Sequence, residues 1–222
     1  MNNIQSKPDI LIIIPARKGS SFSRKNVQPC LGRPLIHYTF NASKITTPHD
    51  TIVSTNCHEV RAEAEFYYFK THERKYEHAT ATATLDTVIY EIAKEYSTYN
   101  IFILLPPTSP LRTAQHAQEA LDQFNRDGAD SLISVTEELK SIWKETDHFA
   151  RPIVERNRNR QSCEPVYIAN GAIFISKRDS ILNSKHKVSG RVSLYKMSMA
   201  DSVDVHNKED IQLAEYHLGK KS

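Results

Sequence analysis

Cysteine is scarce in this chain of 222 residues, which contains only three. Cys30, Cys57 and Cys163 lie far apart in the sequence and are odd in number. This pattern forms neither a disulfide framework nor a Cys-x-x-Cys metal site, and it indicates a reducing compartment. We therefore predict that the protein is cytoplasmic.

Long hydrophobic runs are missing as well. The aliphatic stretch at residues 10–14 is too short for the apolar region of a signal peptide, and it falls far below the roughly 20 residues that span a bilayer. Charge of a single sign is also lacking, since the net charge is only +3. We therefore expect neither a nucleic acid nor a membrane as a partner.

Several well-known functional motifs are absent too. The chain has no Gly-x-x-x-x-Gly-Lys-Ser/Thr loop, no Gly-x-Gly-x-x-Gly turn and no His-Glu-x-x-His pair. Ser109 lacks the Gly-x-Ser-x-Gly setting of a hydrolase nucleophile. These absences argue against a P-loop nucleotide site, a dinucleotide site, a zinc peptidase and a serine hydrolase.

What the chain does contain is an alternation of short apolar runs and segments of helical periodicity. Such alternation predicts an α/β protein with a mostly parallel sheet covered by helices on both faces. In these sheets ligands bind at the carboxyl ends of the strands, so the loops after Ile14 and Leu105 should face one cleft. The predicted strands are residues 10–14, 51–55, 101–105, 131–135, 170–175 and 195–199, with 66–70 ambiguous, and the predicted helices are residues 34–43, 58–66, 114–126, 209–218 and a segment starting at 85.

The loop after the first strand has the composition of a phosphate-binding loop. Gly19 permits a close approach of the backbone, and the neighbouring serines and free N–H groups can donate hydrogen bonds. Arg17, Arg24 and Lys25 can neutralise several negative charges. The alternative is a solvated surface loop that happens to be basic.

Residues 137–166 interrupt the alternation, because they are polar, rich in arginine and without clear apolar periodicity. Three alternatives are a flexible insertion, a patch for nucleic acid and an arm exchanged between subunits. The modest net charge argues against nucleic acid. We expect residues 1–222 to form one domain with residues 137–166 as an insertion.

Six motifs, in a fixed order, resemble those of one family. They are Ile14-Pro-Ala-Arg-x-Gly-Ser, Arg24-Lys25-Asn26, Pro-Thr-Ser-Pro-Leu-Arg at residues 107–112, Arg160-Gln161, Tyr167-x-x-Asn-Gly-Ala-Ile, and Ser-Val-Asp at residues 202–204. Together they resemble the acylneuraminate cytidylyltransferases, which activate sialic acid and other nonulosonic acids.

The resemblance implies a three-layer, Rossmann-like nucleotidyltransferase. Its expected reaction transfers CMP from CTP to the anomeric hydroxyl of a sialic-acid-like or other 2-keto-3-deoxy sugar acid and releases pyrophosphate. It also implies Mg²⁺ or Mn²⁺ as the cofactor and a homodimer in which the insertion reaches the second subunit.

The resemblance also assigns roles to individual residues. Those expected to bind the nucleotide are Arg17, Gly19, Ser20, Arg24, Lys25, Asn26, Arg74 and Thr84. Those expected to bind the sugar acid are Thr108, Ser109, Arg112, Arg160, Gln161, Tyr167 and Asn170, where arginine suits a bidentate grip on a carboxylate. Arg17, Lys25 and Asp204 are the expected catalytic residues, and Asp204 with His206 the expected metal ligands.

Some positions depart from the family's pattern. The first loop is one residue shorter before Arg24, Pro106 replaces a glutamine, and the metal-binding Asp-x-Asp pair reads Asp204-Val205-His206. Imidazole is a poor ligand for Mg²⁺, which prefers oxygen. Two hypotheses therefore remain, an active cytidylyltransferase and a non-catalytic relative that binds a nucleotide or a sugar.

Overall fold

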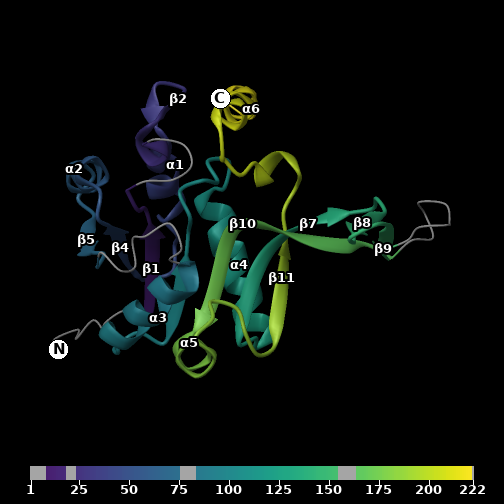
Figure 1. Ribbon diagram of the computed structural model, residues 1–222. Helices are drawn as coiled ribbons and strands as arrows, with labels where there is room; N and C mark the ends of the chain where they lie inside the picture. Colours follow the sequence, from purple (N-terminus) through teal and green to yellow (C-terminus); the bar gives the residue numbers. More distant parts are fainter. Residues whose placement is uncertain (1–8, 19–23, 76–83, 155–163, 222) are drawn as a thin grey trace.

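The chain folds around a seven-stranded sheet in the order β11-β7-β10-β6-β1-β4-β5 (Figure 1). The computed structural model describes residues 9–18, 24–75, 84–154 and 164–221. The strands of the sheet are β1 (Ile10–Pro15), β4 (Asp50–Thr55), β5 (Lys70–Glu73), β6 (Ile101–Leu104), β7 (Ser131–Glu138), β10 (Val166–Lys177) and β11 (Val192–Lys196).

Neighbouring strands of this sheet run parallel except where β10 pairs antiparallel with β6 and β7. The other described elements are two short 3-10 helices, η1 (Lys25–Val27) and η4 (Ala200–Ser202), together with six α-helices and four short strands. The α-helices and short strands are α1 (Leu35–Ala42), α2 (His58–Phe66), α3 (Leu85–Glu95), α4 (Ala114–Asp127), α5 (Arg178–Ser184), α6 (Lys208–Gly219), β2 (Pro29–Cys30), β3 (Arg33–Pro34), β8 (Ile142–Glu145) and β9 (Ala150–Val154).

Strand β1 lies inside the sheet between β6 and β4, and every residue in it is apolar and buried. Alternate side chains point to opposite faces of a strand, so β1 contributes to hydrophobic clusters on both faces of the sheet. Ile12 packs with α4, whereas Leu11 and Ile13 pack with α3 and α5. Ile14 joins a third cluster with residues of α1 and α2. The result is the predicted three-layer arrangement with helices on both faces.

Local signals explain the helix ends that the sequence predicts well. At the start of α4 the Thr113 hydroxyl accepts a hydrogen bond from the His116 backbone N–H, and the Thr113 backbone N–H donates one to Nδ1 of the His116 ring. The same helix ends at Gly128, whose φ of 60° suits a left-handed cap. Thr84 caps α3 by accepting a hydrogen bond from the backbone N–H of Thr87.

The described residues 137–154 and 164–166 belong to an arm that projects from the body (Figure 1). Strands β7 and β10 continue beyond the body as a pair, and β8 and β9 form an antiparallel hairpin beside them. The sequence marks this region only as an interruption. Its description as an insertion into a single domain stays a prediction.

Three elements differ from the expectations. Residues 66–70, which the sequence leaves open between a helix end and a short strand, contain the end of α2, and the strand lies at 70–73. Tyr68 adopts a φ of 61° between the two, and Phe69 donates a backbone hydrogen bond to Ala64. The last strand spans 192–196 rather than 195–199. Helix α5 was not predicted.

Across the described ranges, no helix combines the length and apolar character needed to cross a membrane. The two described cysteines, Cys30 and Cys57, are buried and are not joined in a disulfide. Cys163 lies outside the described residues.

Candidate active site

A cleft of about 320 Å³ opens at the carboxyl ends of β1 and β6. These strands are parallel, so the loops that follow them leave the sheet at the same edge. Both loops line the cleft, which confirms the prediction that they face one site. The lining residues are Pro15, Arg17, Lys25, Asn26, Arg74, Thr84, Leu85, Pro106, Pro107, Thr108, Gly171, Phe174, Asp204 and His206.

Eight of the residues predicted from the sequence therefore meet in this cleft. They come from four separate stretches of the chain: the first loop, the segment from β5 to the cap of α3, the loop after β6, and the segment before α6. The eight residues are Arg17, Lys25, Asn26, Arg74, Thr84, Thr108, Asp204 and His206.

Three basic side chains give the cleft its positive charge. Lys25 is partly buried, and its Nζ donates a hydrogen bond to the Val205 carbonyl at 3.0 Å. Burial lowers the pKa of Lys25, the charge of Arg17 lowers it further, and Asp204 opposes the shift. Burial and the charge of Arg17 also lower the pKa of Arg74 to about 10. These mutual effects show that cations are held close together, an arrangement that an anionic ligand would stabilise.

The first loop is braced by hydrogen bonds on both sides of the undescribed stretch. The Asn26 side chain donates to the Arg17 carbonyl at 3.2 Å, and the Lys18 backbone donates to the Asn56 side chain at 2.7 Å. Arg24 adopts a φ of 56° and pairs with Glu59 of α2 at 2.5 Å. Arg24 is therefore turned toward α2 and does not line the cleft.

Asp204 is the carboxylate of the cleft. Its Oδ2 lies 2.9 Å from His206 Nε2, whereas its Oδ1 is buried and has no hydrogen-bond partner among the described residues. The described residues contain no cluster of three histidine, cysteine or acidic side chains that could hold a metal. Mg²⁺ commonly uses one or two carboxylates together with waters and substrate phosphates. The unpartnered Oδ1 fits such a ligand, but the His206 ring is already engaged with Asp204.

A β-bulge shapes the wall opposite the first loop. The register between β7 and β10 shifts between Ala169 and Phe174, and Gly171 takes a φ of 73° within this shift. A Cβ atom on Gly171 would lie 3.3 Å from Oδ2 of Asp204. Glycine at this position therefore allows the strand to pass close beside the carboxylate.

Arg112 does not reach the cleft, contrary to the expectation that it grips a sugar carboxylate. It is only 2% exposed, and its guanidinium donates to the carbonyls of Pro106 and Ala172 and to the hydroxyl of Thr39. Burial lowers its pKa to about 9. Arg112 thus braces the backbone of the loop and strand that line the cleft.

Other residues expected to bind the sugar are also placed away from the cavity lining. Ser109 is buried. The Asn170 side chain accepts hydrogen bonds from Ser134 Oγ and the Ala172 backbone, and it donates to Ser202, so it holds the bulge in place. Tyr167 lies on β10 in the arm, where its hydroxyl accepts a hydrogen bond from Lys196.

Four predicted site residues lie outside the described residues, namely Gly19, Ser20, Arg160 and Gln161. Conversely, the assignment of site residues from sequence missed Gly171 and Phe174, which line the cleft from β10. The neighbouring Asn170 motif was the available signal, but it drew attention to the polar side chain rather than to the glycine beside it.

Comparison with known proteins gives a family match over nearly the whole chain. Residues 11–212 match the family model described as cytidylyltransferase. The chain belongs to the cytidylyltransferase family. The resemblance inferred from the motifs is therefore confirmed.

Curated relatives share this family. The chain is 31% identical over 210 residues to the N-acylneuraminate cytidylyltransferase of Streptococcus agalactiae serotype V, covering 90% of this chain and 51% of that protein. It is 34% identical over 215 residues to the N-acylneuraminate cytidylyltransferase of Escherichia coli O18:K1:H7, covering 92% and 51%. The chain thus spans about half the length of these relatives.

Solved structures bear out the three-layer nucleotidyltransferase fold. The structure of a CMP:2-keto-3-deoxy-manno-octonic acid synthetase complexed with CTP superimposes with a TM-score of 0.73 at 14% identity. The match covers 96% of this chain and 99% of the other.

Proposed function

We propose that this chain transfers CMP from CTP to the anomeric hydroxyl of a sialic-acid-like or other 2-keto-3-deoxy sugar acid and releases pyrophosphate. The observation that carries the proposal is the convergence of Arg17, Lys25 and Arg74 on a cleft that also contains Asp204. The family match and the names of the curated relatives support the same reaction.

The cations explain how the cleft would promote this reaction. Attack on the α-phosphate of CTP concentrates negative charge on the phosphates and on the departing pyrophosphate, so fixed positive groups stabilise the transition state. Arg17 and Lys25 come from the first loop, and Arg74 follows β5 on the same side of the cleft. Thr84 and Asn26 supply polar groups that suit the nucleoside, and Thr108 is the described candidate for contact with the sugar acid.

A divalent cation, Mg²⁺ or Mn²⁺, is part of the proposal. Asp204 would hold it through the buried Oδ1 that has no partner among the described residues. When bound, the cation would neutralise charge on the phosphate oxygens. His206 would act by fixing Asp204 through the contact at 2.9 Å rather than as a metal ligand.

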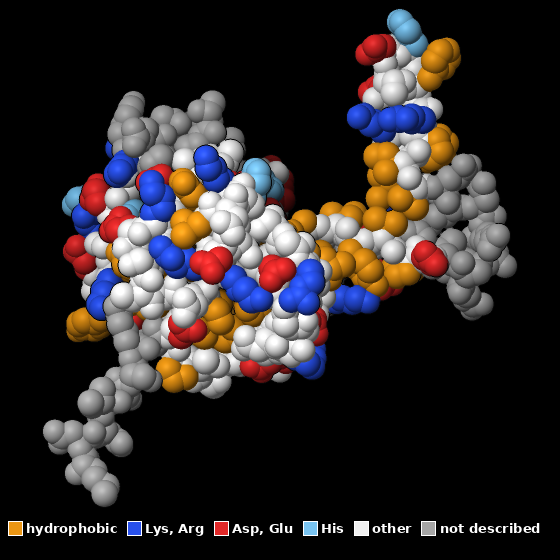
Figure 2. Space-filling model, turned by 90° about the horizontal axis from the view of Figure 1, so that it is seen from below, with side chains coloured by type: hydrophobic (Ala, Val, Ile, Leu, Met, Phe, Trp, Pro, Cys, Tyr) orange, Lys and Arg blue, Asp and Glu red, His pale blue; other side chains and the backbone are white. Residues whose placement is uncertain are grey.

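The arm supports a homodimer. Trp143, Phe149 and Ile153 are 56%, 80% and 63% exposed. Figure 2 shows hydrophobic side chains gathered along the arm that projects from the body. Exposed apolar surface of this kind is typical of contacts between subunits. Replacing Trp143 and Ile153 with serine should shift the mass measured by light scattering from dimer to monomer, and a monomeric unmodified chain would contradict this part of the proposal.

The cytoplasm is the proposed compartment. Its support is that the two described cysteines are buried without a disulfide, as expected under reducing conditions.

A direct assay tests the reaction. Purified protein is incubated with CTP, Mg²⁺ or Mn²⁺ and a panel of 2-keto-3-deoxy sugar acids, while pyrophosphate is measured and the CMP-sugar is identified by mass. We expect pyrophosphate release that requires both CTP and one of the sugar acids. Failure with every metal and acid, in a protein that still binds CTP, would contradict catalysis.

That failure would favour the second hypothesis, a non-catalytic relative that binds a nucleotide or sugar. One observation supports it, because His206 occupies one oxygen of the proposed metal-binding carboxylate. The variant His206→Asp separates the two hypotheses. A gain of Mg²⁺-dependent activity from an inactive parent would show that the histidine had disabled the site, whereas a loss of existing activity would show that the histidine serves catalysis.

A further inference from the structure

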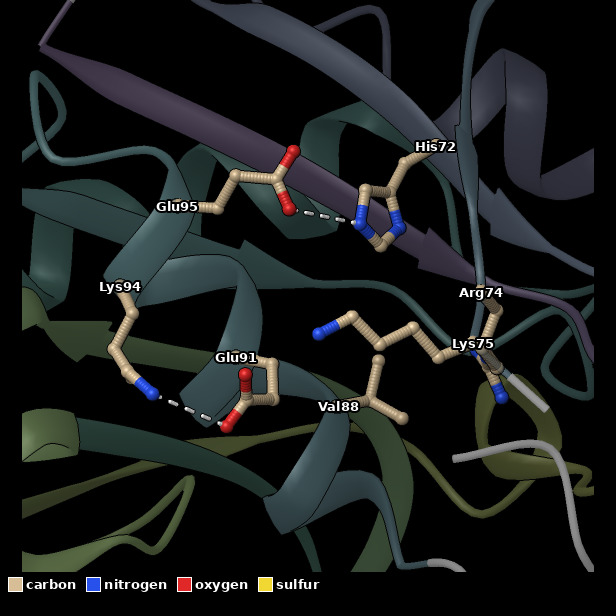
Figure 3. A pocket seen from close by; sticks show the side chains of 7 residues that line it. All are labelled: His72, Arg74, Lys75, Val88, Glu91, Lys94 and Glu95. Atoms are coloured by element: carbon tan, nitrogen blue, oxygen red, sulfur yellow. Dashed lines mark ion pairs between the residues drawn. The ribbon is translucent and has the colours of Figure 1, made fainter. Parts of the chain in front are cut away.

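A second cavity, of about 280 Å³, is lined by residues of β5 and α3 and shares Arg74 with the cleft (Figure 3). Arg74 lines both cavities and is 5% exposed. Burial and the charge of Arg17 both disfavour its positive charge. The orientation of Arg74 therefore depends on the groups that it contacts within the protein.

Arg74 is the first member of a series of polar contacts that continues through Ser54 and His72 to Glu95. Arg74 donates from Nη2 to the Ser54 carbonyl at 3.1 Å, and its Nε lies 3.5 Å from Ser54 Oγ. Ser54 Oγ lies 3.1 Å from Nδ1 of His72, and Nε2 of the same ring lies 3.4 Å from a carboxylate oxygen of Glu95. Figure 3 shows the His72 ring between Glu95 and Arg74.

The hydrogen-bonding capacities of these groups determine which one donates and which one accepts at each contact. The Glu95 carboxylate accepts, so it favours the tautomer of His72 with the proton on Nε2. Nδ1 is then an acceptor for the Ser54 hydroxyl, and the oxygen of that hydroxyl keeps its lone pairs for Arg74 Nε. Without the acceptor on His72, the buried Ser54 hydroxyl could turn and compete with Arg74 for other acceptors.

We propose that His72 is a positioning residue that acts through Ser54 to hold Arg74 in the orientation in which it lines the nucleotide cleft. His72 does not line that cleft, so it does not touch the nucleotide itself. The inference rests on the proposed function, because it assigns to Arg74 a contact with CTP.

The variant His72→Leu removes the acceptor and keeps an apolar side chain of moderate size. We expect the dissociation constant for CTP, measured by calorimetry, to rise about fivefold, which corresponds to the loss of one buried hydrogen bond. The kcat at saturating CTP should fall by less than the affinity does, because Arg17 and Lys25 remain in place in the cleft. The variant His72→Asn places an amide oxygen near the position of Nδ1 and should restore most of the affinity.

A double-mutant cycle with Ser54→Ala distinguishes a relay from two unrelated effects. If His72 acts through Ser54, the double variant should bind CTP about as weakly as Ser54→Ala alone. Glu91→Gln is the matched control, because Glu91 lines the same cavity but pairs with Lys94. Its affinity for CTP should equal that of the unmodified protein.

The outcomes separate this inference from the proposed function. Unchanged CTP affinity in folded His72→Leu, or additive effects in the cycle, would overturn the inference and leave the proposed function standing. If His72→Leu does not fold, His72→Phe, whose ring also lacks the acceptor, takes its place in the same cycle with Ser54→Ala. An unmodified protein that does not bind CTP would overturn both.

Discussion

The polar side chains on the two sides of the cleft point in different directions. On the side of β1, β4 and β5, the basic residues Arg17, Lys25 and Arg74 face the cavity. On the side of β6 and β10, Arg112 and Asn170 turn their polar atoms to neighbouring backbone and side chains instead. The resemblance to the family predicts that both sets of residues bind the substrates.

The difference teaches that a motif residue can serve a site either by touching the ligand or by shaping the wall. Arg112 ties the Pro106 carbonyl to the Ala172 carbonyl, and so joins the loop after β6 to the bulge of β10. The half of the cleft with Arg17, Lys25 and Arg74 is accordingly built to supply positive charge. The opposite half, with Arg112 and Asn170, is built to fix the shape of the backbone.

The largest expected effect is that of Asp204→Asn. It removes an anionic oxygen from the proposed metal-phosphate site, so turnover should fall by about 100-fold or more in the pyrophosphate assay. Asp201→Asn is the control, because Asp201 pairs with Lys221 and does not line the cleft. Equal turnover in Asp204→Asn and the unmodified protein would remove Asp204 from the site.

The two buried arginines should then respond differently. Arg74→Met should raise the dissociation constant for CTP about 30-fold through the loss of charged hydrogen bonds, with a small effect on the melting temperature. Arg112→Met leaves three buried acceptors without their donor, so the free energy of unfolding should fall by about 3 kcal/mol.

Denaturant unfolding and calorimetry of both variants measure this contrast. Arg126→Met, on the exposed side of α4, is the control and should change neither quantity. An Arg112→Met variant that is as stable as the parent but no longer binds CTP would contradict the structural role of Arg112, because Arg112 would then act as a ligand-binding residue.

Gly171→Ala tests the close approach of the bulge to Asp204. A φ of 73° costs a non-glycine residue about 1 kcal/mol, and the new Cβ would press on the carboxylate. We expect kcat to fall severalfold while CTP affinity changes little. Gly219→Ala, in α6 with open space around it, should leave kcat unchanged. Equal kcat in both variants would show that the bulge does not set the position of Asp204.

The smallest effect is expected at Asp130, at the edge of the sheet opposite the cleft. Its carboxylate accepts hydrogen bonds from the Arg191 backbone and from Lys177, which lower its pKa to about 2. A lowered pKa stabilises the fold above the ordinary value of 3.8, and this contribution disappears as the pH falls toward 2.

Asp130→Asn should therefore be less stable than the parent at neutral pH and should lose less stability on acidification through this range. Melting curves between neutral and acidic pH measure the difference. CTP affinity should stay constant, and a change in it would mean that this distant edge influences the cleft.

Much of the body could be predicted from the sequence because its signals are local. Residues 58–66 form the predicted helix, and the end of α4 follows from Gly128. The start of β5 at Lys70 could not be predicted, because it depends on the left-handed turn at Tyr68. Helix α5, with seven residues, is too short to show periodicity.

The sequence predicts which residues belong to the site better than it predicts where their side chains point. The resemblance to the family assigns Arg74 and Arg112 to the site, but the direction of each side chain depends on acceptors supplied by other strands. Ser54 of β4 orients Arg74, and Ala172 of β10 captures Arg112. The same reasoning explains why Gly171 was overlooked, since its role is a backbone shape beside Asp204.

The central claim is that the basic half of the cleft holds the triphosphate of CTP. Calorimetric titration of CTP into the unmodified protein and into Lys25→Met tests it most directly, with Lys44→Met, on the exposed surface, as the control. The account predicts binding to the unmodified protein and the control, and affinity at least about tenfold weaker in Lys25→Met. Equal affinity in all three proteins would contradict it.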